Sequence, residues 1–321
     1  MKTKIIDWLL EERDPSVRYL ALEGLKSLSA NSAALEDAKT KAHREGKIAF
    51  ILDKMHAEGY WHTPGAGYSP KYKSTVWALL LLAQLGADLN EDPRIASAVS
   101  YYYNNAFREA GQITDSQTRG ISFDCLQGNM IYALLRLGLE PQLLEEQNTW
   151  LVRSQTGEGI APLNDKKAQE RYLVGKCGPS FACSFNLKKP CAWGAIRVLM
   201  AIGQVPEAQR SENMKRVIGE GLDFLLGVDP FHPEWTGSKP LSPRWGQLFF
   251  PIFYKSDFLH LAEALASVGA IGDPRAGRLI DFILSKRNSE GSWNLDYSDV
   301  SLGGSFGPLG KPNKWVSLRA L

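Results

Sequence analysis

The sequence predicts an all-α fold built as a ring of helical hairpins. Four apolar segments of helical character each end in a glycine, a residue that suits the C-terminal end of a helix. A more polar, amphipathic segment follows each one after a short connection. A helix that is apolar on all sides is expected inside a protein and an amphipathic helix outside, so the repeat predicts alternating inner and outer helices. The four glycines are Gly86, Gly138, Gly203 and Gly269.

The two ends of the chain complete this prediction. Residues 14–25 and residues 311–321 both have the pattern of further inner helices, which can meet and close the ring. We therefore expect about six inner and five or six outer helices in a single domain over residues 1–321.

The connections between the predicted helices are of two lengths. Each inner helix is followed by a loop of a few residues, whereas the returns to the next inner helix are long. In a ring of hairpins the return loops share one face with the N-termini of the inner helices, and long loops in a compact domain are usually functional. We expect the site at this face. The long connections lie near residues 106–122, 156–189, 228–255 and 288–312.

Composition narrows the class of protein. The chain is 44% hydrophobic and 22% charged, which is typical of a globular protein, and its net charge of +2 gives no general attraction to nucleic acid. Asp7, Glu11 and Glu12 interrupt the first apolar stretch, which argues against a secretory signal, and no apolar run reaches the roughly 20 residues of a membrane span. We expect a cytoplasmic protein without a transmembrane segment, in which the four cysteines are reduced.

The cysteines gather around two predicted inner helices. Cys125 and Cys191 each begin a Cys-x-x-Gly stretch, and they lie 66 residues apart, close to the 65 residues between the glycines that end the two helices. The two thiols are therefore expected side by side at the loop face. The same spacing leads from Cys191 to Asp257, which shares a helix face with His260.

Thiolates, a carboxylate and an imidazole at one face are the ligands of tetrahedral zinc. The predicted ligands are Cys125, Cys183 and Cys191, with Cys177 or His260 as a fourth, and Asp124 and Asp257 are the candidate catalytic carboxylates. Two alternatives remain open. The cysteines can simply pack as small buried side chains, and four cysteines can also hold an iron–sulfur cluster.

Basic residues also precede the predicted inner helices. A cation is disfavoured at a helix N-terminus and an anion is favoured there, so these residues suggest a site for a phosphate or diphosphate. The alternative is that the long lysine side chains extend into water. The candidate anion-binding residues are Lys73, Lys255, Lys314, Arg244 and Tyr254.

Two short stretches carry a family resemblance. Residues 55–61, Met-His-Ala-Glu-Gly-Tyr-Trp, and residues 287–293, Arg-Asn-Ser-Glu-Gly-Ser-Trp, are similar to the Gln-x-x-x-Gly-x-Trp turns of squalene cyclases, without the Gln; a third stretch, from Gln155 to Gly159, keeps the Gln and lacks the Trp. Together with the helical repeat, they resemble the prenyltransferase and squalene-cyclase superfamily, including bacterial prenyltransferase/squalene oxidase repeat proteins. The resemblance implies an α/α toroid like that of terpenoid cyclases and protein prenyltransferases.

The resemblance also carries functional expectations. Protein prenyltransferases bind zinc through an Asp, a Cys and a His of this region, and Cys191 and His260 match the last two, whereas Lys189 stands at the Asp position. This implies a zinc-dependent enzyme for a hydrophobic, isoprenoid-like substrate, with or without a diphosphate, and a partner α subunit. The acidic motifs Asp-x-Asp-Asp and Asp-Asp-x-x-Asp are absent. The alternative is a metal-stabilised binding or scaffold protein that has lost cyclase chemistry.

Overall fold

The computed structural model describes residues 2–24, 32–116, 121–160, 167, 177–233, 235, 242–299 and 302–321, and helices make up most of them. The prediction of a mainly helical fold is confirmed. Parts of the four long predicted connections lie outside the described residues. These parts are 117–120, 161–166, 168–176, 234, 236–241 and 300–301.

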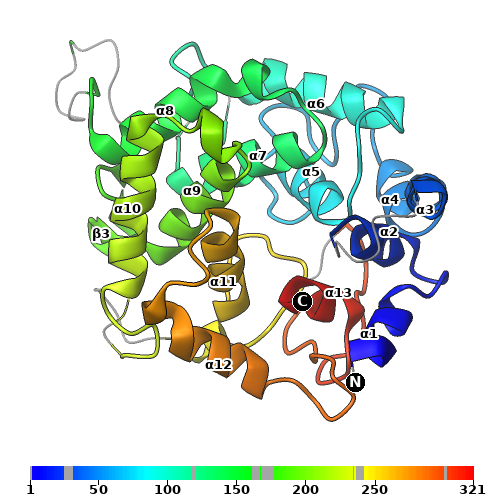
Figure 1. Cartoon of the computed structure of the whole chain (residues 1–321). Coiled ribbons are helices and arrows are strands. Elements are labelled where there is room, and N and C mark those ends of the chain that lie inside the picture. Colours follow the sequence, from blue (N-terminus) through cyan, green and yellow to red (C-terminus); the bar gives the residue numbers. More distant parts are fainter. Residues whose placement is uncertain are drawn as a thin grey trace.

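Six helices lie toward the middle of the molecule in Figure 1. They are α2 (Pro15–Gly24), α5 (Thr75–Gln84), α7 (Asp124–Arg136), α9 (Ala192–Gly203), α11 (Phe258–Ser267) and α13 (Lys314–Ala320). Their apolar sequences explain this position, because burial removes each apolar surface from water. In α5, every residue from Thr75 to Ala83 is buried.

These six helices contact one another in order. Helix α7 packs against α5 and α9, α9 packs against α11, and α13 packs against both α11 and α2. Gly86, just after α5, lies against Tyr19 and Leu20 of α2, which completes the circuit. Helices α7 and α9 approach closely at Gly128, since a Cβ there would lie within 3.0 Å of backbone atoms of Arg197 and Val198.

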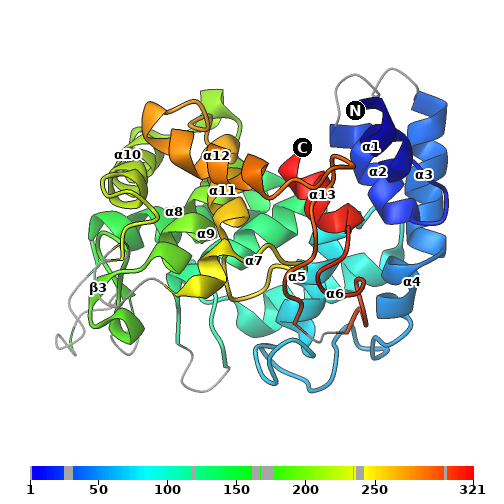
Figure 2. The same cartoon turned by 90° about the horizontal axis from the view of Figure 1, so that it is seen from below.

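The remaining α-helices lie outside this group (Figure 1), and α3, α6, α8, α10 and α12 each contact the central helix that comes before them in the chain. They are α1 (Lys2–Leu9), α3 (Ser32–Arg44), α4 (Lys47–Leu52), α6 (Pro93–Ala106), α8 (Glu145–Thr156), α10 (Glu212–Leu226) and α12 (Gly277–Ser285). The long connection between α4 and α5 lies at the lower edge of Figure 2, and the C-terminus lies toward the opposite edge. None of the helices in the described residues is long and apolar enough to cross a membrane.

The connection between α8 and α9 contains a small antiparallel sheet. Its strands are β1 (Cys177–Gly178), β2 (Ala182–Cys183) and β3 (Lys189–Pro190), in the order β1-β2-β3. Cys177 lies opposite Cys183, and Cys183 lies opposite Lys189. The sheet brings two cysteines next to the start of α9.

Tryptophans close three of the turns that follow outer helices. The indole N–H of Trp61 donates to the carbonyl of Ile51 at 2.9 Å, and that of Trp293 donates to Ile283 at 2.7 Å. Trp235 repeats this contact with Leu225 at 2.9 Å, although its sequence lacks the turn pattern. Each indole N–H satisfies a carbonyl near the end of an outer helix.

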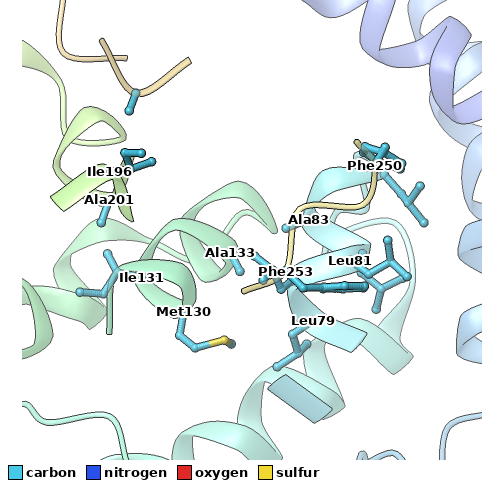
Figure 3. Packing of buried hydrophobic residues seen from close by; sticks show 14 of the residues in the cluster. Leu79, Leu81, Ala83, Met130, Ile131, Ala133, Ile196, Ala201, Phe250 and Phe253 are labelled. Carbon is cyan, nitrogen blue, oxygen red and sulfur yellow. The ribbon is translucent and has the colours of Figure 1, made fainter. Parts of the chain in front are cut away.

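Residues 249–257 form a buried segment across the middle of the molecule. Figure 3 includes Phe250 and Phe253 of this segment in the packed core, together with residues of α5, α7 and α9. Phe253 stacks on Tyr72, and Phe250 stacks on Trp315 at the start of α13. We call residues 249–257 the central segment.

Candidate functional site

The four cysteines lie at the N-terminal ends of α7 and α9. Cys125 is the second residue of α7, and Cys191 immediately precedes α9 as its N-cap. Cys177 and Cys183 face each other across β1 and β2, and the Cys191 amide donates to Phe181 O at 2.9 Å next to this sheet. All four thiols are free of disulfide bonds.

Each of the four thiols takes part in a hydrogen bond. Cys191 and Cys183 are hydrogen-bonded through their sulfurs, and this bond lowers the pKa of Cys183 and raises that of Cys191. The thiol of Cys125 donates to the Tyr254 hydroxyl at 3.3 Å. Cys177 accepts the backbone N–H of Asp124 at 3.2 Å, and burial raises its pKa.

Asp124 is buried beside this cluster. Its carboxylate accepts from Ser154 Oγ at 2.9 Å, and burial raises its pKa to about 6, although hydrogen bonds from Gln155, Ser154 and Cys177 oppose the rise. The acid is 6% exposed, so it ties α7 to α8 rather than facing a substrate from solvent.

The donor types of this cluster fit zinc, which thiolates bind well. In the part of the chain that the structure describes, however, no three His, Cys, Asp or Glu side chains come close enough together to hold an ion. The imidazole of His260 is buried, and its Nδ1 lies 3.1 Å from Ser256 Oγ. No contact between His260 and a cysteine is present among the described residues.

Asp257 serves as an anchor. Fully buried, it accepts the N–H groups of His260 at 2.6 Å and Phe249 at 3.0 Å, which caps α11 and holds the start of the central segment. Arg319 of α13 bonds to Asp257 and, through two nitrogens, to Glu263. One guanidinium thus pairs with both carboxylates.

The central segment is bonded to the surrounding helices along its length. Gln84 both donates to and accepts from the backbone of Ile252, at 2.7 and 2.8 Å. Asn129 donates to Phe253 O at 3.1 Å. These bonds satisfy backbone groups that would otherwise be buried without partners, so the segment is a fixed part of the core.

A cavity of about 670 Å³ lies on the other side of the central segment from Cys125. It is lined by residues of all six central helices, mostly from their C-terminal halves, and by Phe250 and Ile252. Glu23 and Arg136, whose side chains are 40% and 36% exposed, lie on its wall near the ends of α2 and α7. The cavity therefore reaches solvent at the face opposite the cysteines. Its apolar wall includes Leu20, Leu80, Ala83, Met200, Trp315 and Leu318.

Polar groups also face this cavity. His260 and Glu263 of α11 lie on its wall, with Asn129 and Tyr132 of α7. Burial lowers the pKa of His260 well below its usual value and raises that of Glu263, whose pairing with Arg319 opposes the rise. The imidazole is therefore neutral at physiological pH.

The predicted anion-binding residues lie at the loop face, and most of them already contact other side chains of the protein. Lys255 Nζ lies 2.6 Å from Tyr297 OH and 3.0 Å from Asp299, and Lys314, 7% exposed, pairs with two carboxylates of the α1–α2 turn. Arg244 lies over the ring of Tyr297. Lys73 is exposed. The Tyr254 hydroxyl is held by Cys125.

Three charged residues of this site belong to no sequence motif. Arg197, Arg319 and Glu263 occupy ordinary positions within apolar helices. A charged residue inside an otherwise apolar helix is itself a signal of a buried polar contact, and it is the signal that would have found them.

No family model matches the chain, and no curated protein matches it either.

Proposed function

We propose that the protein is an α/α toroid of the prenyltransferase and squalene-cyclase type that binds a hydrophobic small molecule in its central cavity. We propose further that the cysteines hold a structural zinc ion. The observation that carries this function is the central segment, which fills the middle of the molecule between the thiols and the cavity. A metal at the thiols would therefore stabilise the fold, and ligand binding would take place at the other face.

The circuit of helix contacts supports the toroid. Six central helices touch in chain order, the last touches the first, and a following outer helix packs against each of the first five. The repeated indole–carbonyl contacts of Trp61, Trp235 and Trp293 support it too, because the turns after three outer helices share the same contact.

The size and walls of the cavity support the ligand class. A volume of about 670 Å³ is in the range of small-molecule sites. About half of its lining residues are aliphatic or aromatic, and polar groups from α7 and α11 can orient a hydroxyl or similar group. Its charged side chains are paired, Arg136 with Glu23 and Arg319 with Glu263, which favours a ligand without a formal charge.

The zinc would be held by Cys125, Cys177, Cys183 and Cys191, whose side chains would have to move closer together than they lie in the structure. When bound, it would join the sheet to the N-terminal ends of α7 and α9 and replace the hydrogen bonds that the thiols make in the structure. Structural zinc is fully coordinated by protein side chains, which suits a site covered by Tyr254 and by the sheet.

Two measurements test this function. Lipid extraction and mass spectrometry of the purified protein should recover an apolar compound, and Met200→Trp, which fills the cavity, should abolish its binding. Met214→Trp makes the same change on outer helix α10 and should leave binding intact. Metal analysis should find one zinc per chain, lost in Cys191→Ser and weakened in Cys125→Ser. Equal binding by both tryptophan variants would refute the cavity, and a zinc-free wild type would refute the metal.

A second function, enzymatic rather than binding, is favoured by the presence of His260 and Glu263 on one cavity wall. A neutral imidazole and a carboxylate are suitable groups for proton transfer. If the protein is an enzyme, the recovered compound should be converted on incubation. Glu263→Gln and His260→Gln should then stop conversion while binding persists.

A further inference from the structure

His260 lies between two buried polar side chains and the central cavity. Its Nδ1 is 3.1 Å from Ser256 Oγ, and Ser256 Oγ accepts a hydrogen bond from the Arg197 guanidinium at 2.6 Å. Ser256 and Arg197 are 3% and 1% exposed, so bulk water does not reach either side chain. His260 itself lines the cavity. The imidazole thus connects a buried hydrogen-bond chain to the space proposed for the ligand.

The hydroxyl proton of Ser256 has one acceptor in reach. An arginine only donates hydrogen bonds, so Arg197 occupies a lone pair of Ser256 Oγ and cannot take its proton. Across the described residues, Nδ1 of His260 is the only other polar atom within hydrogen-bond distance of this oxygen. Because buried polar groups are almost always hydrogen-bonded, Ser256 donates its proton to Nδ1.

This hydrogen bond fixes the tautomer of His260. Burial, together with the charges of Arg197 and Arg319, lowers the pKa of the imidazole well below its usual value, so the ring is neutral. When Nδ1 of a neutral imidazole accepts a hydrogen bond, the ring proton is on Nε2. The backbone is held as well, since the His260 N–H donates to the capping carboxylate of Asp257 at 2.6 Å. His260 therefore presents an Nε2–H donor in a fixed position.

The Nε2–H group is available to a ligand. Nε2 makes no hydrogen bond to any residue that the structure describes, and it is not one of the polar atoms there that are buried without a partner. Because His260 lines the cavity, Nε2 is accessible from the cavity space. A few such polar groups in a largely apolar pocket usually determine the orientation of the ligand.

We propose that the Nε2–H of His260 is the hydrogen-bond donor that recognises the ligand of the central cavity, and that this ligand is an apolar molecule with a neutral oxygen acceptor, a carbonyl or a hydroxyl group. This inference rests on the ligand-binding cavity of the proposed function. The acceptor is uncharged because the arginines of the cavity wall, Arg136 and Arg319, are each paired with a glutamate. Ser256 is a positioning residue, since it acts on the ligand only through the tautomer of His260.

The test compares two probes of nearly the same shape, methyl naphthyl ketone and isopropenylnaphthalene, in which a methylene group replaces the carbonyl oxygen. Isothermal titration gives the ratio of their affinities, which cancels general changes in the cavity. His260→Phe should lower the ketone-to-alkene ratio by about 5- to 100-fold, because the buried carbonyl loses its donor. His260→Gln should retain most of the ratio, since its amide N–H can take the place of Nε2–H.

Tyr132 is the rival donor, because its hydroxyl also lies on the cavity wall and makes no hydrogen bond within the described ranges. A ratio that falls in Tyr132→Phe and not in His260→Phe would overturn the inference while the cavity stands. Equal ratios in wild type and His260→Phe would do the same. A wild type that binds neither probe would overturn the proposed function and the inference with it.

A second measurement needs no ligand and keeps the inference testable if His260→Phe does not fold. Nitrogen NMR of the wild-type protein with isotope-labelled histidine shows which ring nitrogen carries the proton, and His260→Gln identifies the His260 signals. His43 is the internal reference for the other tautomer, because its Nε2 accepts the Asp88 N–H at 2.8 Å and its Nδ1 lies 2.8 Å from Lys39 O. His260 should show the opposite pattern to His43. A proton on Nδ1 of His260 would overturn the inference.

The same spectrum tests the positioning role of Ser256. Ser256→Thr keeps the hydroxyl and should keep the Nε2–H form of His260. Ser256→Ala removes the donor to Nδ1 and should give a mixture of the two tautomers. An unchanged spectrum in Ser256→Ala would overturn the role assigned to Ser256.

Discussion

The two Cys-x-x-Gly stretches look equivalent in sequence, but alanine should have opposite effects at their glycines. A Cβ at Gly128 would lie 2.5 Å from the carbonyl oxygen of Arg197 and 2.7 Å from its carbonyl carbon. A Cβ at Gly194 would meet only the Cβ atoms of Asp124 and Cys191, at 3.7 and 3.9 Å. The first pair of distances is a collision with backbone, and the second is ordinary van der Waals contact.

The expected energies follow from this difference. Replacing a helical glycine with alanine gains about 1 kcal/mol of helix propensity at either position. At Gly128 the collision cannot be relieved by a side-chain rotation, so α7 and α9 must separate, at a cost near the upper end of the roughly 1–3 kcal/mol typical of overpacking. Gly128→Ala should therefore lose about 2 kcal/mol and Gly194→Ala should gain up to about 1 kcal/mol.

Urea unfolding followed by circular dichroism measures both variants. A net difference of about 3 kcal/mol between them is expected from these terms. Because α7 and α9 carry Cys125 and Cys191, Gly128→Ala should also weaken zinc binding, whereas Gly194→Ala should not. Equal stability of the two variants would refute the close approach of α7 and α9 at Gly128.

Three further outcomes are expected. Burial keeps the pKa of His260 in the folded chain well below its usual value of about 6.5, whereas the unfolded chain takes up the proton near that value. The free energy of unfolding should therefore fall by up to about 1.4 kcal/mol for each pH unit below about 6.5. His260→Gln should flatten this part of the stability profile, measured by urea unfolding. An unchanged profile would show that His260 is accessible to protons in the fold. Trp293→Phe should lose about 1–3 kcal/mol in the same assay, because it leaves the Ile283 carbonyl unpaired; a loss below about 0.5 kcal/mol would contradict that role. Lys314→Met should lower the melting temperature by separating α13 from the α1–α2 turn, and high salt should shrink the difference from wild type; a salt-independent difference would contradict the ion pairs.

The helices were predictable because their signals are local. Apolar periodicity marks a helix that must be buried, and a glycine with positive φ such as Gly86, Gly138 or Gly269 marks its end. These signals need only a few turns of chain. The third indole–carbonyl contact, from Trp235 to Leu225, was not predictable in the same way, because the residues before Trp235 lack the glycine turn. Only the ten-residue spacing between tryptophan and carbonyl is shared with the other two contacts.

The partners of the charged residues were not predictable, because they come from distant parts of the chain. Lys314 is paired by Glu11, 303 residues away, and Lys255 by Asp299, 44 residues away. In the sequence both lysines stand at the starts of predicted inner helices, which suggested a free anion site. In the fold their charges are already matched by carboxylates.

The position of the cavity depends on the central segment, whose buried course sequence patterns do not predict. The aromatic residues of 249–254 have the composition of a loop wall at a binding face, which is how the sequence presents them. Bonds from Gln84 and Asn129, together with the Asp257 cap, hold this segment within the core instead, where it fills the cysteine side. Because the space between the N-terminal halves of the central helices is filled in this way, the space that remains opens among the C-terminal halves of the same helices. The thiols and the cavity therefore lie on opposite sides of the central segment, and a change at either should reach the other only through that segment.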